Sequence, residues 1–323
     1  MSRLVAVLLA FILVVPSSFA ASKTTKKSSN SSSRSATPAR QQSSPTRPES
    51  PGIARPFAVP NEDDPSVFPS VSAPAVLLCD AVTGRVLYEK NADDVRAVAS
   101  TQKLLTALVV AEEGDLYRNV TVSATDGQCE PTKLGIKAGE VYKRYDLLKI
   151  LLVKSMNDVA RCLARDNAGS VTAFADKMNA KAREIGMRHS NFVNPNGLTE
   201  GGQYSTARDM ARLGLHVYRN RVVRGIMNMR TLAWRTAGGK TLTYENTNKL
   251  MKYFGLCNGM KTGYTEAAGH CLVSSASEDG KHLICVVLGE QKRQDIWTDS
   301  YRMLTWGFQQ LKQDPQPSTA TNP

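Results

Sequence analysis

The sequence predicts an α/β (α+β) domain, in which an antiparallel sheet is flanked by helices and joined to a mostly helical lobe. Strand-like runs lie near the start of the folded part, at 75–80 and 85–89, and near its end, at 269–276 and 282–288. Between them, apolar residues recur at the i, i+3, i+4 spacing of helices. One sheet closed by both chain ends accounts for this order and leaves a cleft between sheet and helices.

The helices are expected from the same periodicity. Four apolar patterns predict helices after the first hairpin, in the middle of the chain and at its end, at 145–154, 172–185, 205–218 and 295–311. A further helix begins near Ser100, where apolar residues follow at 104, 105, 108 and 109. A serine at this point is a good N-cap or first-turn residue.

The residues before the folded part indicate export. A charged start, the apolar run 4–15 and small residues up to Ala21 are typical of a secretory signal peptide over 1–20. An uncleaved anchor is the alternative, although the run is shorter than the roughly 20 residues of a membrane span. Residues 21–70, rich in Ser, Pro and basic residues, are expected to be a disordered tether. The catalytic domain is then 71–312, with a sheet lobe of about 71–115 and 225–312, a helical lobe of about 116–224, and a disordered tail at 313–323.

The chain's net charge of +12 says little about the folded part. Residues 21–56 contain seven Lys/Arg and one Glu, so half of that charge lies in this stretch of the tether. This favours contact of the tether with an anionic membrane surface or wall polymer, and no nucleic-acid partner is expected.

The cysteines and histidines give no support for a metal site or another cofactor. None of the six cysteines forms a CxxC motif, and the four histidines are scattered. Export permits disulfides, but Cys271 and Cys285 are not expected to pair. If Asp279-Gly280 makes a two-residue turn, Cys285 lies opposite Ser274 and faces the other side of the sheet from Cys271.

Three short motifs carry the chemistry: Ser100-Thr-Gln-Lys103, Ser155-Met-Asn157 and Lys261-Thr-Gly263. Each alone is weak, but their combination in this order is the signature of active-site-serine penicillin-binding proteins and class A β-lactamases. Lys103 lies one helical turn after Ser100, so the two side chains share a face. A lysine becomes a base when burial and a second cation destabilise its proton, and Lys261 is expected to be that cation. Backbone N–H groups at Ser100, at a helix start, suit an oxyanion.

The sequence resembles the low-molecular-mass penicillin-binding proteins, serine-type D-alanyl-D-alanine carboxypeptidases of peptidase family S11. The resemblance runs from about Ala75 to Phe308 and includes the stretches 135–139, 194–198, 204–210, 246–248, 259–269 and 305–308. It implies the penicillin-binding/β-lactamase-like transpeptidase fold, with peptidoglycan stem peptides and β-lactams as ligands.

The resemblance also implies roles for the motif residues. Ser100 would be the nucleophile, Lys103 the general base, and Ser155 the relay of a proton to the departing D-alanine. The substrate-binding residues would be Asn157, Lys261, Thr262, Gly263 and Tyr264, with the N–H groups of Ser100 and Tyr264 forming the oxyanion hole.

Four functions fit the sequence, ranked from the most to the least favoured. A DD-carboxypeptidase that removes the terminal D-alanine is the first interpretation, and a DD-endopeptidase that cuts D-Ala–diaminopimelate cross-links is the second. A β-lactamase is disfavoured because the middle motif is Ser-Met-Asn and no Glu-x-x-Leu-Asn follows it. A silent peptidoglycan-binding module is disfavoured by the intact serines and lysines.

Overall fold

The structure, a computed structural model, describes residues 68–313. The predicted signal peptide, nearly all of the predicted tether and nearly all of the predicted tail therefore lie outside the described residues.

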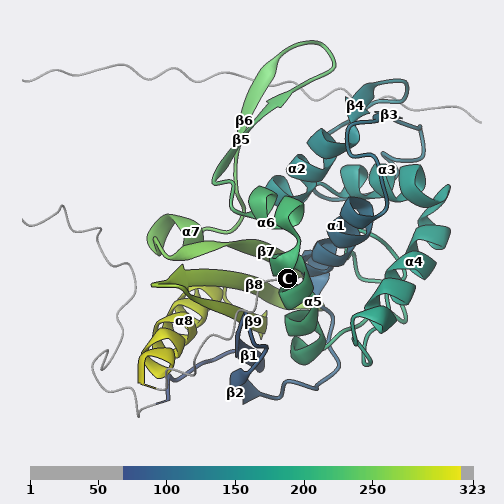
Figure 1. Ribbon diagram of the computed structural model, residues 1–323. Coiled ribbons are helices and arrows are strands. Elements are labelled where there is room, and N and C mark those ends of the chain that lie inside the picture. Colours follow the sequence, from purple (N-terminus) through teal and green to yellow (C-terminus); the bar gives the residue numbers. More distant parts are fainter. Residues whose placement is uncertain (1–67, 314–323) are drawn as a thin grey trace, which may run out of the picture. The chain divides into compact units, whose positions relative to one another are not determined.

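A five-stranded antiparallel sheet, in the order β2-β1-β9-β8-β7, is built from both ends of this part of the chain (Figure 1). Its strands are β1 (Ala75–Asp80), β2 (Val86–Lys90), β7 (Cys257–Thr265), β8 (Gly269–Glu278) and β9 (Lys281–Glu290). β1 pairs directly with β9, with Ala75 opposite Leu288. The predicted closure of one sheet by the two ends is confirmed, and β7 becomes an edge strand.

The turn between β8 and β9 has the predicted register. Glu278 lies opposite Lys281, and Asp279 and Gly280 both have positive φ, which a tight two-residue hairpin turn requires. Ser274 therefore lies opposite Cys285, as expected, and all six cysteines are free.

Both faces of the strands β1, β8 and β9 are largely buried, because helices cover each of them. α8 (Asp295–Gln313) packs on β8 and β9 from one side, and α5 (Ala207–Arg219) packs on β9 and β1 from the other. Successive side chains of β1 point to opposite faces of the sheet. Leu77 belongs to the core that the sheet forms with the helical lobe, and Leu78 belongs to the core that it forms with α8. Burial on both faces explains why these strands read as continuous apolar runs.

The helices that the periodicity predicts are present, and the structure adds a 12-residue helix at 157–168 that no predicted range includes, together with three short ones. Their bounds are η1 (Ala99–Gln102), α1 (Lys103–Glu112), α2 (Arg144–Lys154), α3 (Asn157–Ala168), α4 (Val171–Glu184), α5 (Ala207–Arg219), α6 (Arg221–Met227), α7 (Leu250–Tyr253) and α8 (Asp295–Gln313). α1 is buried along nearly its whole length. Because α1 contacts α2, α3, α4, α5 and α6, it forms the centre of the helical part.

Two small hairpins complete the fold. β3 (Asn119–Thr121) pairs with β4 (Val141–Lys143), and β5 (Thr231–Arg235) pairs with β6 (Thr241–Glu245). The second hairpin projects from the domain in Figure 1, and the Trp234 ring lies 5.1 Å from that of Tyr142. Neither of these strand pairs was predicted from the sequence.

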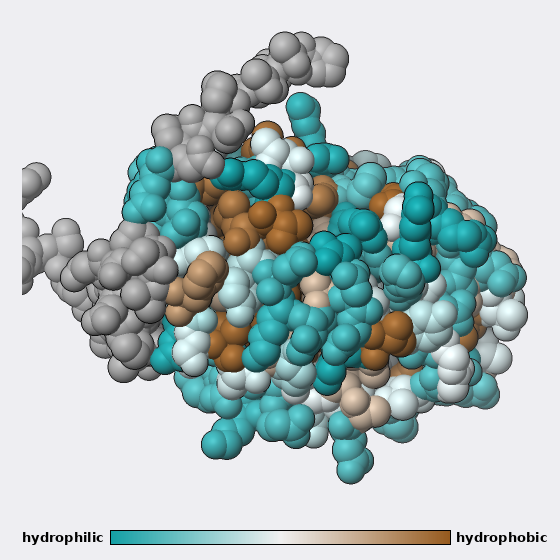
Figure 2. Space-filling view, turned by 90° about the horizontal axis from the view of Figure 1, so that it is seen from below, coloured by the Kyte–Doolittle hydropathy of each residue, from teal (hydrophilic) through white to brown (hydrophobic). Residues whose placement is uncertain are grey.

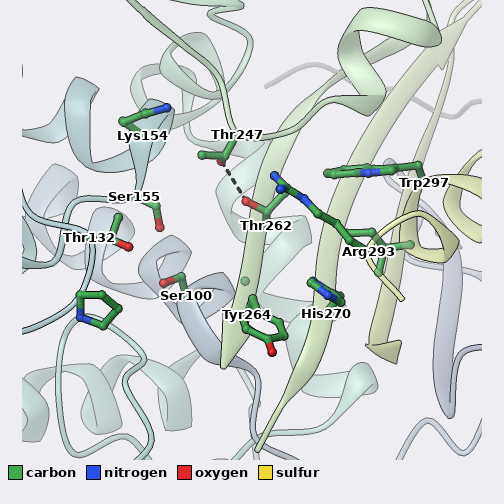
Figure 3. Close-up of a pocket in the computed structure, with 13 residues that line it drawn as sticks. Ser100, Thr132, Lys154, Ser155, Thr247, Thr262, Tyr264, His270, Arg293 and Trp297 are labelled. Atoms are coloured by element: carbon green, nitrogen blue, oxygen red, sulfur yellow. Dashed lines mark hydrogen bonds between the residues drawn. The ribbon is translucent and has the colours of Figure 1, made fainter. Parts of the chain in front are cut away.

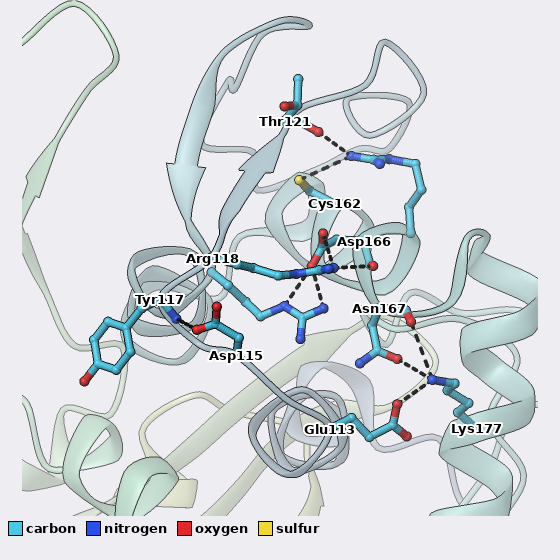
Figure 4. A network of polar contacts seen from close by, with 11 residues as sticks. Glu113, Asp115, Tyr117, Arg118, Thr121, Cys162, Asp166, Asn167 and Lys177 are labelled. Carbon is cyan, nitrogen blue, oxygen red and sulfur yellow. Dashed lines mark hydrogen bonds and ion pairs between the residues drawn. The ribbon is translucent and has the colours of Figure 1, made fainter.

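Ion pairs tie the outer helices together (Figure 4). Asp166 on α3 accepts hydrogen bonds from Arg118, at 2.5 Å, and from Nε of the buried Arg144, at 2.7 Å. Lys177 on α4 pairs with Glu113 and donates to Asn167 Oδ1 at 3.1 Å. These contacts fix α3 and α4 around α1.

The face shown in Figure 2 is mainly hydrophilic, with hydrophobic side chains in small separate groups. Within residues 68–313, no helix combines the length and the apolar character needed to cross a bilayer.

Candidate active site

Ser100 lies in the short 3₁₀ turn η1, directly before α1. Its hydroxyl makes no capping bond, so the predicted first-turn position is correct whereas the N-cap role is not. The turn is tightly constrained: Ala99 has a φ of +49°, and a Cβ at Gly197 would come within 2.2 Å of the Ala99 carbonyl oxygen. Only glycine fits there, which lets the 194–198 loop pack directly against the turn that carries Ser100.

Lys103 is fully buried, and its ammonium nitrogen meets three oxygen atoms. Nζ lies 2.8 Å from Ser100 Oγ, 2.7 Å from Asn157 Oδ1 and 2.5 Å from the Asn196 carbonyl oxygen. A neutral amine has two N–H groups and one lone pair. It can donate to Asn157 and Asn196 while its lone pair accepts the proton of Ser100, so this geometry suits a base.

The charges around Lys103 weaken its hold on a proton. Burial, followed by the nearby charge of Lys261, lowers the pKa of Lys103 well below its ordinary value. Burial also lowers the pKa of Lys261 to about 7. Within residues 68–313, neither lysine has a carboxylate partner at ion-pair distance. The two lysines are therefore buried close enough for their charges to interact, without an acid to offset them.

Strand β7 runs past the Ser100 turn at very short range. A Cβ at Gly263 would lie 2.9 Å from the Ser100 amide nitrogen and 3.0 Å from that of Thr101. Thr262 donates its hydroxyl proton to Thr247 Oγ1 at 2.8 Å, and Lys261 Nζ donates to the Thr262 carbonyl at 3.0 Å. Because Gly263 has no side chain, the edge strand β7 can approach Ser100 closely. A peptide bound along this strand could then also contact Ser100.

The middle motif is divided between two helices. Ser155 ends α2 in the left-handed conformation, with φ of 70°, and Asn157 begins α3. Asn157 was predicted to bind the substrate amide, but both ends of its side-chain amide are engaged within the protein. Oδ1 accepts from Lys103, and Nδ2 donates to the Pro131 carbonyl at 2.6 Å. In the structure it holds Lys103 in position.

These elements border a cavity of about 350 Å³ between the sheet edge and the helices (Figure 3). Five predicted site residues line it, while Lys103, Asn157 and Lys261 lie behind its wall; the five are Ser100, Ser155, Thr262, Gly263 and Tyr264. The cavity is also lined by residues that sequence reasoning did not place there, namely Pro131, Thr132, Lys154, Thr247, His270, Arg293, Ile296 and Trp297.

Some of these additional residues had a sequence signal. Thr247 lies inside the family-like stretch 246–248, and Arg293 follows β9 in a loop whose pattern is loose. His270 had none: it lines the cleft because it pairs with Tyr264 across β7 and β8, and their rings stack at 4.3 Å. The role of the Asn196 carbonyl had no signal either, since any residue type supplies a carbonyl.

Comparison with known proteins agrees with this geometry. The family model described as D-alanyl-D-alanine carboxypeptidase, peptidase S11, matches residues 61–292. The chain therefore belongs to the peptidase S11 family, and its fold is that of the penicillin-binding DD-peptidases.

Individual relatives include both kinds of DD-peptidase. The D-alanyl-D-alanine carboxypeptidase DacF of Bacillus subtilis is 32% identical over 75% of this chain and 64% of its own length. The D-alanyl-D-alanine endopeptidase of Escherichia coli is 32% identical over 78% of this chain and 82% of its own length. A solved structure of a Mycobacterium tuberculosis D-alanyl-D-alanine carboxypeptidase matches with a TM-score of 0.72, at 30% identity, over 75% of this chain and 93% of that one. The chain thus spans less than two thirds of DacF.

Proposed function

We propose that the protein is a serine-type D-Ala-D-Ala carboxypeptidase that removes the terminal D-alanine from peptidoglycan stem peptides. One observation carries the proposal: the Lys103 amine lies 2.8 Å from the Ser100 hydroxyl, in a fully buried position without a carboxylate partner among residues 68–313. Such an amine can be neutral near neutral pH, which is what a general base requires.

In the first half of the reaction, Ser100 Oγ attacks the carbonyl carbon between the two D-alanines while its proton passes to Lys103 Nζ. The negative oxygen that forms accepts hydrogen bonds from the backbone N–H groups of Ser100 and Tyr264. The C–N bond then breaks as Lys103 gives its proton to Ser155 and Ser155 passes its own to the departing amine, which leaves Lys103 neutral again. D-Alanine leaves, and the rest of the stem remains as an ester on Ser100.

In the second half, water attacks the ester carbonyl carbon while Lys103 takes one of its protons. The bond to Ser100 Oγ then breaks, and Lys103 returns that proton to Oγ, which releases the shortened stem and restores Ser100. Terminal-carboxylate recognition is assigned to Thr262 and Arg293, which line the cavity, and Lys261 adds positive charge from behind its wall. Thr262 Oγ1 is oriented by Thr247, and Arg293 lines the same cavity. A β-lactam, which carries a carboxylate and a strained amide, would acylate Ser100 in the same way.

The proposed setting is outside the cytoplasm. The support is the signal-like pattern of residues 1–20 and the nature of the substrate, which is part of the cell wall. The basic residues between 21 and 56 suit contact with anionic wall polymer or a membrane surface.

A DD-endopeptidase acting on cross-linked stems is the second candidate, because the E. coli endopeptidase is as similar to this chain, at 32% identity, as DacF is. Both activities use the same acylation step and differ only in the leaving amine.

Two measurements test the proposal. A fluorescent penicillin should label the wild-type protein covalently and should not label Ser100→Ala; equal labelling of both would contradict the role of Ser100. Mass spectrometry of muropeptides after incubation then separates the two activities. Loss of one alanine supports the carboxypeptidase, and loss of cross-linked dimers supports the endopeptidase.

A further inference from the structure

One end of the cleft is lined by Lys154 and Thr247. In Figure 3, Lys154 and Thr247 lie beyond Ser155 and Thr262, at the opposite end from Tyr264. The whole cavity, at about 350 Å³, falls in the range of sites that hold ligands much larger than one amino acid.

The proposed reaction assigns this end to the leaving group. With the reacting carbonyl over Ser100 and its oxygen towards the N–H groups of Ser100 and Tyr264, the departing nitrogen faces Ser155. The carboxylate on the leaving amino acid then reaches Thr262. Any further atoms of the leaving group must extend away from Tyr264, towards Lys154 and Thr247.

Lys154 offers an uncommitted positive charge at this end. It is the last residue of α2 and is partly exposed, and no residue of the described range 68–313 forms a hydrogen bond or ion pair with its ammonium. By contrast, Lys149 on the same helix pairs with Asp146 at 2.6 Å. The residues that line the cavity include Lys154 and Arg293 but neither Asp nor Glu. The wall is therefore complementary to a ligand that carries more than one negative charge.

We propose that Lys154 is a specificity-determining residue, which binds a second carboxylate on the leaving group. The cleft then releases amino acids that carry a side-chain carboxylate in addition to the carboxylate next to the departing amine, such as D-glutamate. The inference rests on the proposed function and adds to it the chemical class of the leaving group. An ammonium at the rim can select such a group by charge without taking part in bond breaking.

The test uses two synthetic peptides with the same acyl part, one ending in D-Ala–D-Glu and the other in D-Ala–D-Gln. The two leaving groups have nearly the same shape and differ by one charge. For the wild-type enzyme, kcat/KM should favour the D-Glu peptide by about fivefold, the size expected of a partly exposed ion pair. The ratio should fall to about one in Lys154→Gln, drop below one in Lys154→Glu and be retained in Lys154→Arg.

Lys143→Gln is the matched control, because Lys143 is an exposed lysine at the other end of α2, and its variant should keep the wild-type ratio. The ratio is measured within each variant, so it does not depend on how much of the protein folds. A purely structural role of Lys154 at the helix end would change both rates equally and leave the ratio intact.

Three results would overturn the inference: no preference in the wild type, a preference that survives in Lys154→Gln, or cleavage of a D-Ala–D-Ala peptide without cleavage of either longer one. In all three, penicillin labelling of Ser100 and D-alanine release would persist, so the proposed function would stand. If the wild type shows neither labelling nor D-alanine release, the proposed function fails and this inference fails with it.

Discussion

Two regions of the protein bury positively charged side chains, but only one of them pairs these side chains with carboxylates. In the helical part, Arg144 is 3% exposed and its guanidinium lies 2.6 Å from the carboxylate of Asp166. At the cleft, Lys103 and Lys261 are 0% exposed, and neither has a carboxylate partner within residues 68–313. Buried charges are normally paired, so the second arrangement is the exceptional one.

The pKa shifts follow the same division. In the helical part, a hydrogen bond to Asp126 raises the pKa of Arg165, so that Arg165 holds its proton more firmly. Burial and the charge of Lys261 lower the pKa of Lys103. Cations paired with carboxylates therefore stabilise the packing of the helices. The unpaired Lys103, by contrast, can give up and take back a proton.

Replacing Lys103 by Ala should have the largest effect on the acylation rate, because it removes the base of the unpaired region. Penicillin acylation of Ser100 should fall by about 10² to 10⁴-fold, the usual contribution of a general base. Stopped-flow measurement of the acylation rate checks this, with far-UV circular dichroism to verify the fold. A Lys103→Ala protein that acylates at the wild-type rate would require a different base.

A substitution that blocks the close approach of β7 to Ser100 should have the next largest effect on the acylation rate. Gly263→Ala places a Cβ within 2.9 Å of the Ser100 nitrogen, where only backbone can move, and should reduce the acylation rate by about 10²-fold. Gly225→Ala is the control, since nothing lies within 4 Å of its added Cβ. Similar rates for the two variants would mean that the strand can shift without consequence.

The paired region should respond in stability and not in chemistry. Asp166→Ala leaves Arg144 buried without its acid and should lower the free energy of unfolding by about 3 kcal/mol. Thermal and urea unfolding measure this, with the exposed Asp176→Ala as the comparison. The acylation rate per penicillin-reactive molecule should stay at the wild-type value, and a large loss would show that the two regions are coupled.

The smallest expected effect is a shift in pH dependence. Acylation should rise with pH as Lys103 loses its proton. In Lys261→Met the burial that mainly lowers the pKa of Lys103 remains, but the repulsion from Lys261 is gone, so the pKa of Lys103 rises partway back. A smaller fraction of Lys103 is then neutral at each pH, and the rising limb moves to higher pH.

Acylation rates between pH 5 and 10 locate that limb, and Lys143→Gln controls for removal of a lysine charge elsewhere. An unmoved limb in Lys261→Met would mean that the two lysines do not interact.

Much of the fold could be predicted because its signals are local. The strands at both ends, the Asp279-Gly280 turn and the helices α2, α4, α5 and α8 follow from periodicity and turn chemistry within short windows. The hairpin of β5 and β6 was missed because its alternation is brief, and its position depends on the packing of Trp234 on Tyr142.

For the candidate site, the sequence by itself determined which side chains are available and that Lys103 follows Ser100 by one helical turn, because that spacing lies within a single element. Only the tertiary structure decided that the Asn196 carbonyl, 93 residues away, meets Lys103, that Asn157 faces inward, and that Lys154 borders the cleft. It also decided that two lysines are enclosed without an acid. Burial and the absence of a partner depend on contacts between distant segments, and no pattern of neighbouring residues encodes them.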